Sequence, residues 1–232
     1  MNHPSSKLVC AAAVLTLGFT AVAGTIYDNS GFYNGNLLQM GDGLTVGNEI
    51  TMSANTWTLT NFSLEYYTPN VTLNSSLGVD VRFYMNNGAL SGGYPTPGTL
   101  FYDSGWFYNN PVGTIQANGA HTINYSGADF YGSPTPLTIT MPGDFTFTIT
   151  FANFGSPTPN TIDLPLANNT PGGSYGDYWL YNSGSSQWTL MTNTVPANFV
   201  VDFSGTPEPS VAGLGAIGSL LLLGASKLKR KS

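Results

Sequence analysis

The segment 145–151 alternates strictly between large apolar side chains and threonine, in the order Phe, Thr, Phe, Thr, Ile, Thr, Phe. Successive side chains of a β-strand point to opposite faces of a sheet, so this period of two predicts a strand with one apolar face. A second run of the same length occupies 79–85, and shorter alternating runs occupy 137–141 and 199–203. An amphipathic helix would instead repeat its apolar residues every three to four positions. The strongest patterns in the chain therefore predict β-structure.

The segment 57–66 is also apolar at alternate positions, but it changes phase. Apolar side chains occupy odd positions up to Leu59 and even positions from Phe62 onward. The change falls at Thr60 and Asn61. One extra residue in a strand moves every later side chain to the other face, so we expect a β-bulge or a sharp bend there.

Further runs of aromatic and β-branched residues predict strands at 99–103, 121–125, 178–181 and 188–191. Turn-forming pairs such as Asn87-Gly88 and Pro142-Gly143 separate the runs. The segment 24–205 shows no convincing amphipathic helix and contains no cysteine. Its stability must come from an aromatic core rather than from disulfides. These features predict an all-β fold, an antiparallel β-sandwich of jelly-roll-like form.

The first 23 residues have the pattern of a secretory signal peptide. A weakly basic start is followed by an apolar run from Leu8 to Phe19 and by Ala21 and Ala23. Signal peptidase accepts only small side chains at those two positions, so cleavage is expected before Gly24. We expect the chain to be exported, with signal peptidase as its first partner.

The segment 206–232 places a short motif, an apolar stretch and a basic end in that order. Pro207, Glu208 and Pro209 precede an uncharged stretch at 211–226, and the basic tail 227–232 follows. A helix over 211–226 would be about 24 Å long, so it could cross a hydrocarbon core of about 30 Å only with membrane thinning or snorkelling. Positive charge stays on the cytoplasmic side, which puts 24–205 outside. The charged residues of the tail are Lys227, Lys229, Arg230 and Lys231.

This C-terminal arrangement resembles the PEP-CTERM sorting domain of Gram-negative bacteria, and the resemblance covers about the last 27 residues. It implies that Pro207, Glu208 and Pro209 are read by exosortase, a membrane transpeptidase-like enzyme. It further implies an inner-membrane precursor whose mature form reaches the outer surface or the extracellular space. Such proteins usually belong to organisms that make exopolysaccharide.

Charge is distributed unevenly along the chain. Eleven of the twelve acidic residues lie between 24 and 205, where Arg82 is the only one of the six basic residues. Nucleic-acid binding needs clustered lysine and arginine, so nucleic acid is excluded as a partner. A strongly acidic polymer is disfavoured for the same reason, unless divalent cations bridge the two.

Catalytic motifs are missing from 24–205. His121 is the only histidine there, and its place in an alternating run favours an ordinary strand residue over a catalytic base. Glu49 and Glu65 are the only glutamates, and no E-x-D-x-x-E strand is present. We therefore expect no catalytic residues. A polysaccharide hydrolase that uses aspartates is kept as the second alternative function.

Oxygen-rich loops leave calcium open as a cofactor. Asp28, Asp42 and Glu49 are close in sequence, although none forms a D-x-[DN]-x-[DN]-G loop. Solvated turn formation is the favoured interpretation. We predict no other metal or cofactor.

Two aromatic clusters are candidate sugar contacts. Trp106 and Tyr108 follow Gly105, and Tyr178 and Trp179 form the second cluster. Sugar sites combine an aromatic face with polar side chains. Sequence alone favours an exported surface or extracellular-matrix protein with a structural or interaction role in an exopolysaccharide or biofilm layer. A carbohydrate-binding module is the first alternative.

Overall fold

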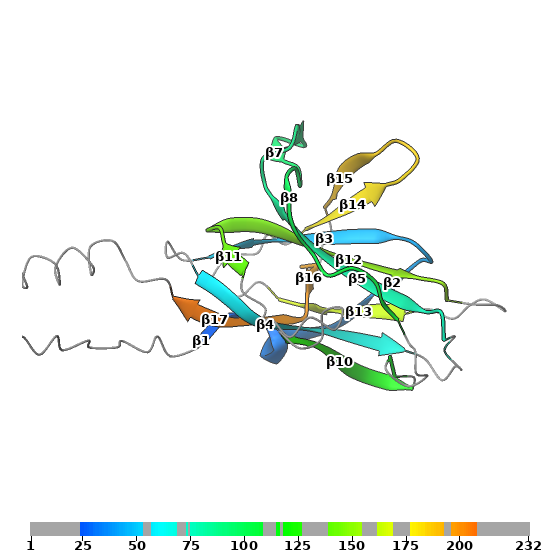
Figure 1. Ribbon diagram of the computed structural model, residues 1–232. Coiled ribbons are helices and arrows are strands. Elements are labelled where there is room, and N and C mark those ends of the chain that lie inside the picture. The colour runs from blue at the N-terminus through cyan, green and yellow to red at the C-terminus, as the bar shows by residue number, and fades with distance from the viewer. Residues whose placement is uncertain are drawn as a thin grey trace, which may run out of the picture.

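We describe residues 24–52, 57–68, 73, 75–108, 115–116, 118–126, 139–154, 162–168, 177–192 and 196–207 of a computed structural model of the chain. These residues form strands and turns, with one short 3-10 helix, η1 (Ser30–Phe32). The predicted all-β class is confirmed (Figure 1). Across this described part, no helix is long and apolar enough to cross a membrane. The predicted signal peptide and the segment beyond Pro207 lie outside the described residues.

The first sheet is built around the longest strand, β4 (Trp57–Thr68), and has eight strands. Its main path runs β1 (Gly24–Asp28), β17 (Val201–Pro207), β4, β13 (Ile162–Ala167) and β16 (Asn198–Phe199). Beside this path, β10 (Gly119–Ser126) and β11 (Ile139–Met141) pair with β4, and β2 (Tyr33–Met40) pairs with β13.

The second sheet has seven strands and contains the two segments with the clearest alternation. Its order is β15 (Gln187–Met191), β14 (Tyr178–Asn182), β3 (Thr45–Thr51), β12 (Asp144–Ala152), β5 (Gly78–Met85) and β8 (Leu100–Asp103). The short β9 (Phe107–Tyr108) also pairs with β5. A separate hairpin joins β6 (Leu90–Ser91) to β7 (Tyr94–Pro95).

Aromatic rings fill the space between the two sheets. Phe62 and Phe203 of the first sheet meet the phenylalanines of β5 and β12. The ring centroids of Phe62 and Phe83 are 5.3 Å apart, and those of Phe147 and Phe203 are 5.5 Å apart, both at steep interplanar angles. Edge-to-face pairs of this kind contribute about 0.5–1.5 kcal/mol each beyond the area that they bury. Every strand pair described is antiparallel, so the predicted antiparallel sandwich is confirmed at this level.

The predicted irregularity near Thr60 is a β-bulge. Ser204 pairs with Asn61, but the next residue, Gly205, pairs with Leu59, so Thr60 has no partner across the ladder. A Cβ atom at Gly205 would collide with the carbonyl oxygen of Thr58. The close approach of the two backbones therefore requires glycine opposite the bulge. The bulge explains why β4 buries Leu59 and Phe62 on the same side despite their odd spacing.

The threonine face of β12 is not open to water. Phe145, Phe147 and Ile149 point into the sandwich, yet Thr146 and Thr148 on the opposite face are also buried. The hydroxyl of Thr146 donates to the Oδ1 of Asn86 at 2.7 Å. Side chains beside β12, such as Asn86, therefore cover its outer face.

Candidate functional site

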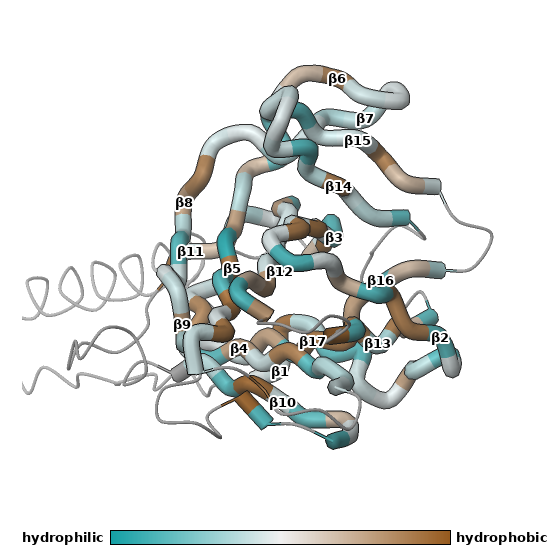
Figure 2. The backbone as a smooth tube through the Cα atoms, turned by 90° about the vertical axis from the view of Figure 1, so that its right-hand side faces the viewer, coloured by the Kyte–Doolittle hydropathy of each residue, from teal (hydrophilic) through white to brown (hydrophobic). Residues whose placement is uncertain are grey.

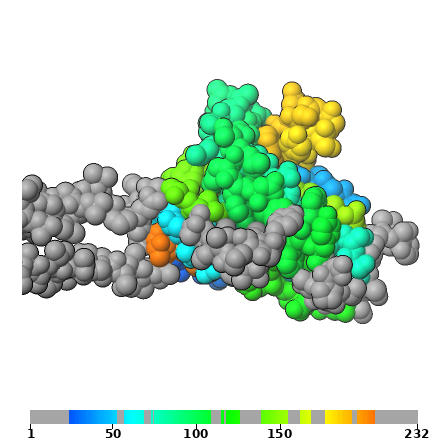
Figure 3. Space-filling view, viewed as in Figure 1, coloured from blue at the N-terminus to red at the C-terminus, as the bar shows by residue number. Residues whose placement is uncertain are grey.

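Two hairpins flank the outer face of the second sheet: β14–β15 is the end of the sheet itself, where β14 pairs with β3, and β6–β7 is a separate hairpin that contacts β15. In Figure 2 the hairpins β6–β7 and β14–β15 lie above β3, β12 and β5, on the side away from the first sheet. Figure 3 shows them as two projections with a notch between them. A groove of about 630 Å³ occupies this region. Its size is within the range of small-molecule and oligosaccharide-sized sites in proteins.

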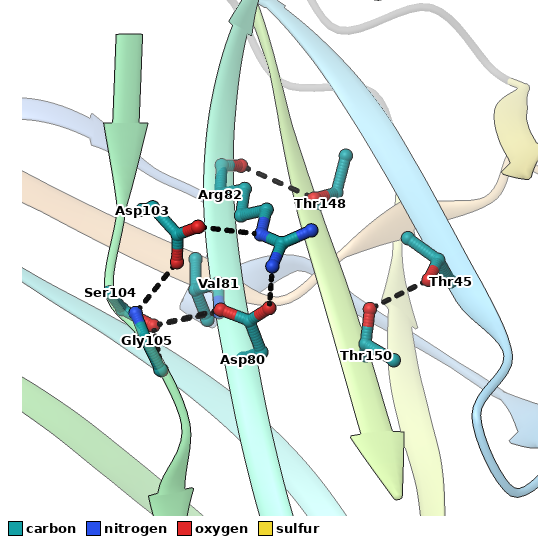
Figure 4. A network of polar contacts seen from close by, with 9 residues as sticks. All are labelled: Thr45, Asp80, Val81, Arg82, Asp103, Ser104, Gly105, Thr148 and Thr150. Atoms are coloured by element: carbon teal, nitrogen blue, oxygen red, sulfur yellow. Dashed lines mark hydrogen bonds and ion pairs between the residues drawn. The ribbon is translucent and has the colours of Figure 1, made fainter. Parts of the chain in front are cut away.

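The floor of the groove is made by outward-facing residues of the central strands. Thr45 of β3 and Arg82 of β5 line it. The hydroxyl oxygens of Thr45 and Thr150 are 2.7 Å apart, and the Thr148 hydroxyl donates to the carbonyl of Arg82 at 3.4 Å (Figure 4). Thr148 and Thr150 are not part of the groove lining, and these bonds engage the hydroxyls of all three threonines within the sheet.

One side of the groove is an aromatic cluster. Trp188 of β15 packs against Tyr181 of β14, with ring centroids 4.8 Å apart, and reaches Tyr84 of β5 at 5.9 Å. Three strands separate β15 from β5 in the sheet order. A side chain could not reach across three strands of a flat sheet, so the sheet curls and brings β15 toward β5. The ring of Trp188 thereby contacts both tyrosines. All three residues line the groove and are partly exposed.

The other side is the β6–β7 hairpin, which is fixed at its base. The Oδ1 of Asn87 accepts a hydrogen bond from the backbone N–H of Thr99 at 2.8 Å, and Gly88 donates its N–H to the carbonyl of Thr96 at 2.9 Å. A Cβ atom at Gly88 would collide with Thr96, and one at Gly98 would collide with Asn87. The two chain segments can come this close only because both positions are glycine. A base bonded in this way gives the groove a rigid wall.

Arg82 is held in place by two carboxylates. Its Nη2 contacts Asp80 and its Nε contacts Asp103, each at 3.0 Å, while the arginine side chain remains 40% exposed (Figure 4). The pKa of Asp80 is raised to about 6, mainly because the carboxyl is buried; Arg82 opposes the rise and Asp103 adds to it. The hydroxyl of Ser104 also donates to Asp80, at 3.4 Å. The guanidinium is thus oriented and largely neutralised, which disfavours an anionic ligand at this place.

The structure buries two of the four predicted sugar contacts. Trp179 is 1% exposed, and Tyr178 packs in the core against Phe199 at 6.0 Å between centroids. A ring without exposed surface cannot stack on a ligand, so this part of the prediction needs correcting. Trp179 is paired with Gly47, whose missing side chain leaves room on the outer face of the sheet. Sequence could not show this packing.

The other two predicted sugar contacts are accessible but lie outside the groove lining. Trp106 and Tyr108 stack on each other, with centroids 6.4 Å apart and an interplanar angle of 24°. Tyr108 is 46% exposed and Trp106 is partly exposed. They remain candidate contacts.

Sequence reasoning missed the aromatic residues that do line the groove, Tyr84, Tyr181 and Trp188. A signal was present for Tyr84, which shares the polar phase of its strand with Asp80 and Arg82. A tyrosine in a phase that faces outward is a candidate for a partly exposed ring.

The three calcium candidates do not converge. Asp28 accepts a hydrogen bond from the N–H of Ser30 at 2.8 Å, and Asp42 accepts one from the N–H of Asn153 at 2.6 Å. Glu49 lies elsewhere, on β3, where burial and the neighbouring Asp144 raise its pKa to about 8. Within the part of the chain that is described, no group of three or more histidine, cysteine, aspartate or glutamate side chains could hold a metal ion.

The two predicted processing sites flank the described sandwich. Gly24 begins β1 and pairs with Gly205, while Pro207 ends β17 and pairs with Trp57. The ends of the sandwich therefore lie side by side at one edge of the first sheet. The remaining predicted processing and sorting residues lie outside the described residues; they are Ala21, Ala23, Glu208, Pro209, Lys227, Lys229, Arg230 and Lys231.

No family model, no curated protein and no solved structure matches this chain.

Proposed function

We propose that this is an exported surface protein whose sandwich binds an uncharged polysaccharide in the groove between the hairpins β6–β7 and β14–β15. The observation that carries the proposal is the convergence of Tyr84, Tyr181 and Trp188 on one walled groove. Aromatic faces suit the C–H-rich faces of sugar rings, and the amide of Gln187 and the guanidinium of Arg82 suit their hydroxyls.

The charge of the groove supports an uncharged ligand. Arg82 is the only basic residue between 24 and 205, and two carboxylates already contact it. An acidic polysaccharide would meet a net negative neighbourhood there. A neutral chain would lose little free energy by displacing water from the floor, because the hydroxyl of Thr45 already bonds to Thr150 within the sheet.

A hydrolase is less well supported than a binding module. Asp80 and Asp103 lie beside the groove, but both are engaged by Arg82. Glu49 and Asp144 hydrogen-bond to each other, and neither lines the groove. A glycosidase needs one carboxyl group as acid and another as nucleophile or base on either side of the bond to be cleaved. We therefore propose binding without catalysis, and no cofactor.

Delivery to the outside is the second part of the proposal. We infer that signal peptidase cleaves before Gly24, that the inner membrane holds the precursor through 211–226, and that exosortase reads Pro207, Glu208 and Pro209. The mature sandwich, of jelly-roll-like form, would then act at the outer surface or in the extracellular polysaccharide or biofilm layer. A purely structural matrix role is the alternative.

The binding proposal is tested with the purified full-length chain on an array of neutral polysaccharides, including β-glucans, xylan, mannan, galactan and chitin. Binding to at least one polymer is expected, and Trp188→Ala should weaken it about tenfold, which corresponds to about 1.4 kcal/mol for the lost contact with the indole ring. Tyr33→Ala is the matched control, because Tyr33 is an exposed ring on β2 of the other sheet. Absence of binding to every polymer would leave only the structural role.

The delivery proposal has a separate test in a Gram-negative host that carries exosortase. Glu208→Gln and a deletion of 227–232 should each leave unprocessed precursor in the inner membrane, detected by immunoblot of membrane fractions. Normal processing of both variants would refute the sorting role of the tail.

A further inference from the structure

Trp106 and Tyr108 form a flat, accessible aromatic pair outside the groove. Their rings stack at 24°, and both lie against Gly78, where a Cβ atom would come within 3.0 Å of the Trp106 ring and 3.1 Å of the Tyr108 ring. The missing side chain of Gly78 lets the rings lie close to the sheet. We call these two residues the platform.

The platform faces the same way as the groove. Tyr108 pairs with Gly78, and paired residues of neighbouring strands share a face. Along β5, Gly78 alternates with inward-facing Val79 and is in phase with Arg82 and Tyr84. The outer face of β5 therefore begins at the platform and ends in the groove, over a distance of about 20 Å for six residues of strand.

Polar side chains occupy the outer face of β5 between Tyr84 and the platform. Arg82 and Asp103 are each 40% exposed, and Asp80 is buried beneath their ion pairs (Figure 4). The outer face of β5 thus has aromatic side chains at both ends and hydrogen-bonding groups between them. This arrangement is complementary to a chain of sugar units, because sugar rings have apolar faces and carry hydroxyl groups at their edges. A single sugar or a disaccharide would reach only one end.

We propose that the platform is a second binding subsite, and that the ligand is an extended neutral polysaccharide chain that lies along the outer face of β5 from the groove to the platform. This inference rests on the proposed function of the groove and specifies its ligand as a long chain rather than a chain end or a short oligosaccharide. Two linked subsites raise the affinity for a chain that reaches both and leave the affinity for a short chain unchanged.

The test uses the full-length protein on an array that carries each neutral polysaccharide together with its oligosaccharides, from disaccharide to octasaccharide. The variants are Trp188→Ala for the groove and Trp106→Ala/Tyr108→Ala for the platform, with thermal melting to verify folding. Tyr108→Phe keeps the ring and is the conservative control. Affinity should rise with chain length, and loss of the platform should weaken polymer binding at least about tenfold while leaving the shortest bound oligosaccharide unaffected.

The outcomes separate the two proposals. Unchanged polymer binding by the double platform variant, with binding abolished by Trp188→Ala, overturns the platform and leaves the groove. Loss of binding in the platform variant alone, with Trp188→Ala unaffected, refutes the groove and shows that the platform binds by itself. The extended-chain inference is overturned if the platform variant loses affinity equally for short and long chains. It is also overturned if the wild-type protein binds nothing on the array.

Discussion

The two faces of β12 are both buried, but they are buried by different means. The inner face is covered by rings from the other sheet, such as Phe203. The outer face is covered within its own sheet, and its side chains are threonines that hydrogen-bond to their neighbours. The inner face stabilises the fold because it buries apolar surface area. The outer face carries polar side chains, ion pairs and partly exposed aromatic rings, which are the groups that can bind a ligand.

The largest expected effect belongs to the inner face. Phe147→Ala should lower the free energy of unfolding by about 3–5 kcal/mol, because it leaves a cavity where the ring packs against Phe199 and Phe203. Urea denaturation of the full-length chain measures this. The control is Thr148→Ala on the same strand, which loses one weak hydrogen bond and should cost about 1 kcal/mol. Equal losses in the two variants would contradict the difference between the faces.

The next effect is a pH dependence on the outer face. Burial, aided by Asp144, raises the pKa of Glu49 from about 4.5 to about 8. A carboxyl whose pKa is higher in the folded state binds more protons there, so its contribution to stability is complete below about pH 4.5 and is lost as the pH rises toward 8. Glu49→Gln keeps a donor toward Asp144 and removes the charge.

The Glu49→Gln variant should therefore have the same melting temperature as the wild type at pH 4.5 and a higher melting temperature than the wild type at pH 8. For a chain of this size, each kcal/mol corresponds to about 2–4 °C in melting temperature. Melting curves recorded across this pH range check the prediction. Parallel pH profiles for the two proteins would show that Glu49 is not protonated in the folded state at neutral pH.

The smallest effect probes how tightly the outer face is packed. A Cβ atom at Gly47 would lie 2.9 Å from the Cγ2 of Thr146 and 3.1 Å from that of Thr148. Gly47→Ala should cost about 1–2 kcal/mol by overpacking. Adding Thr146→Ser removes the nearer methyl but keeps the hydroxyl that donates to Asn86, and should restore part of the loss. If the double variant is no more stable than Gly47→Ala alone, the crowding is not between these two side chains.

The strands that sequence predicted are those with strong alternation or with runs of aromatic and β-branched residues; the latter include β8, β10, β14 and β15. β5, β12 and the bulged β4 follow directly from their apolar phase. The missed strands, β1, β2, β3 and β13, have weak or broken patterns. β3 buries Asn48 on its inner side, and β13 carries Pro165 within a strand. A buried amide is tolerated where it has a hydrogen-bond partner, and Asn48 Nδ2 donates to the carbonyl of Asp177 at 3.2 Å. A proline within a strand likewise depends on its surroundings in the sheet. Such partners are distant in sequence, so the local pattern does not reveal them.

Sequence by itself determined the β-class, the bulge at Thr60, the acidic and cysteine-free character of 24–205, and the expectation of export and sorting. Each depends on residues that are neighbours along the chain. The tertiary structure decided which aromatics are core and which are surface. It buried Tyr178 and Trp179 and brought Tyr84, Tyr181 and Trp188 into one groove. The reason is that long-range pairing sets the strand order: β14 pairs with β3, which is distant in sequence, and the fold brings Trp188 of β15 to Tyr84 of β5.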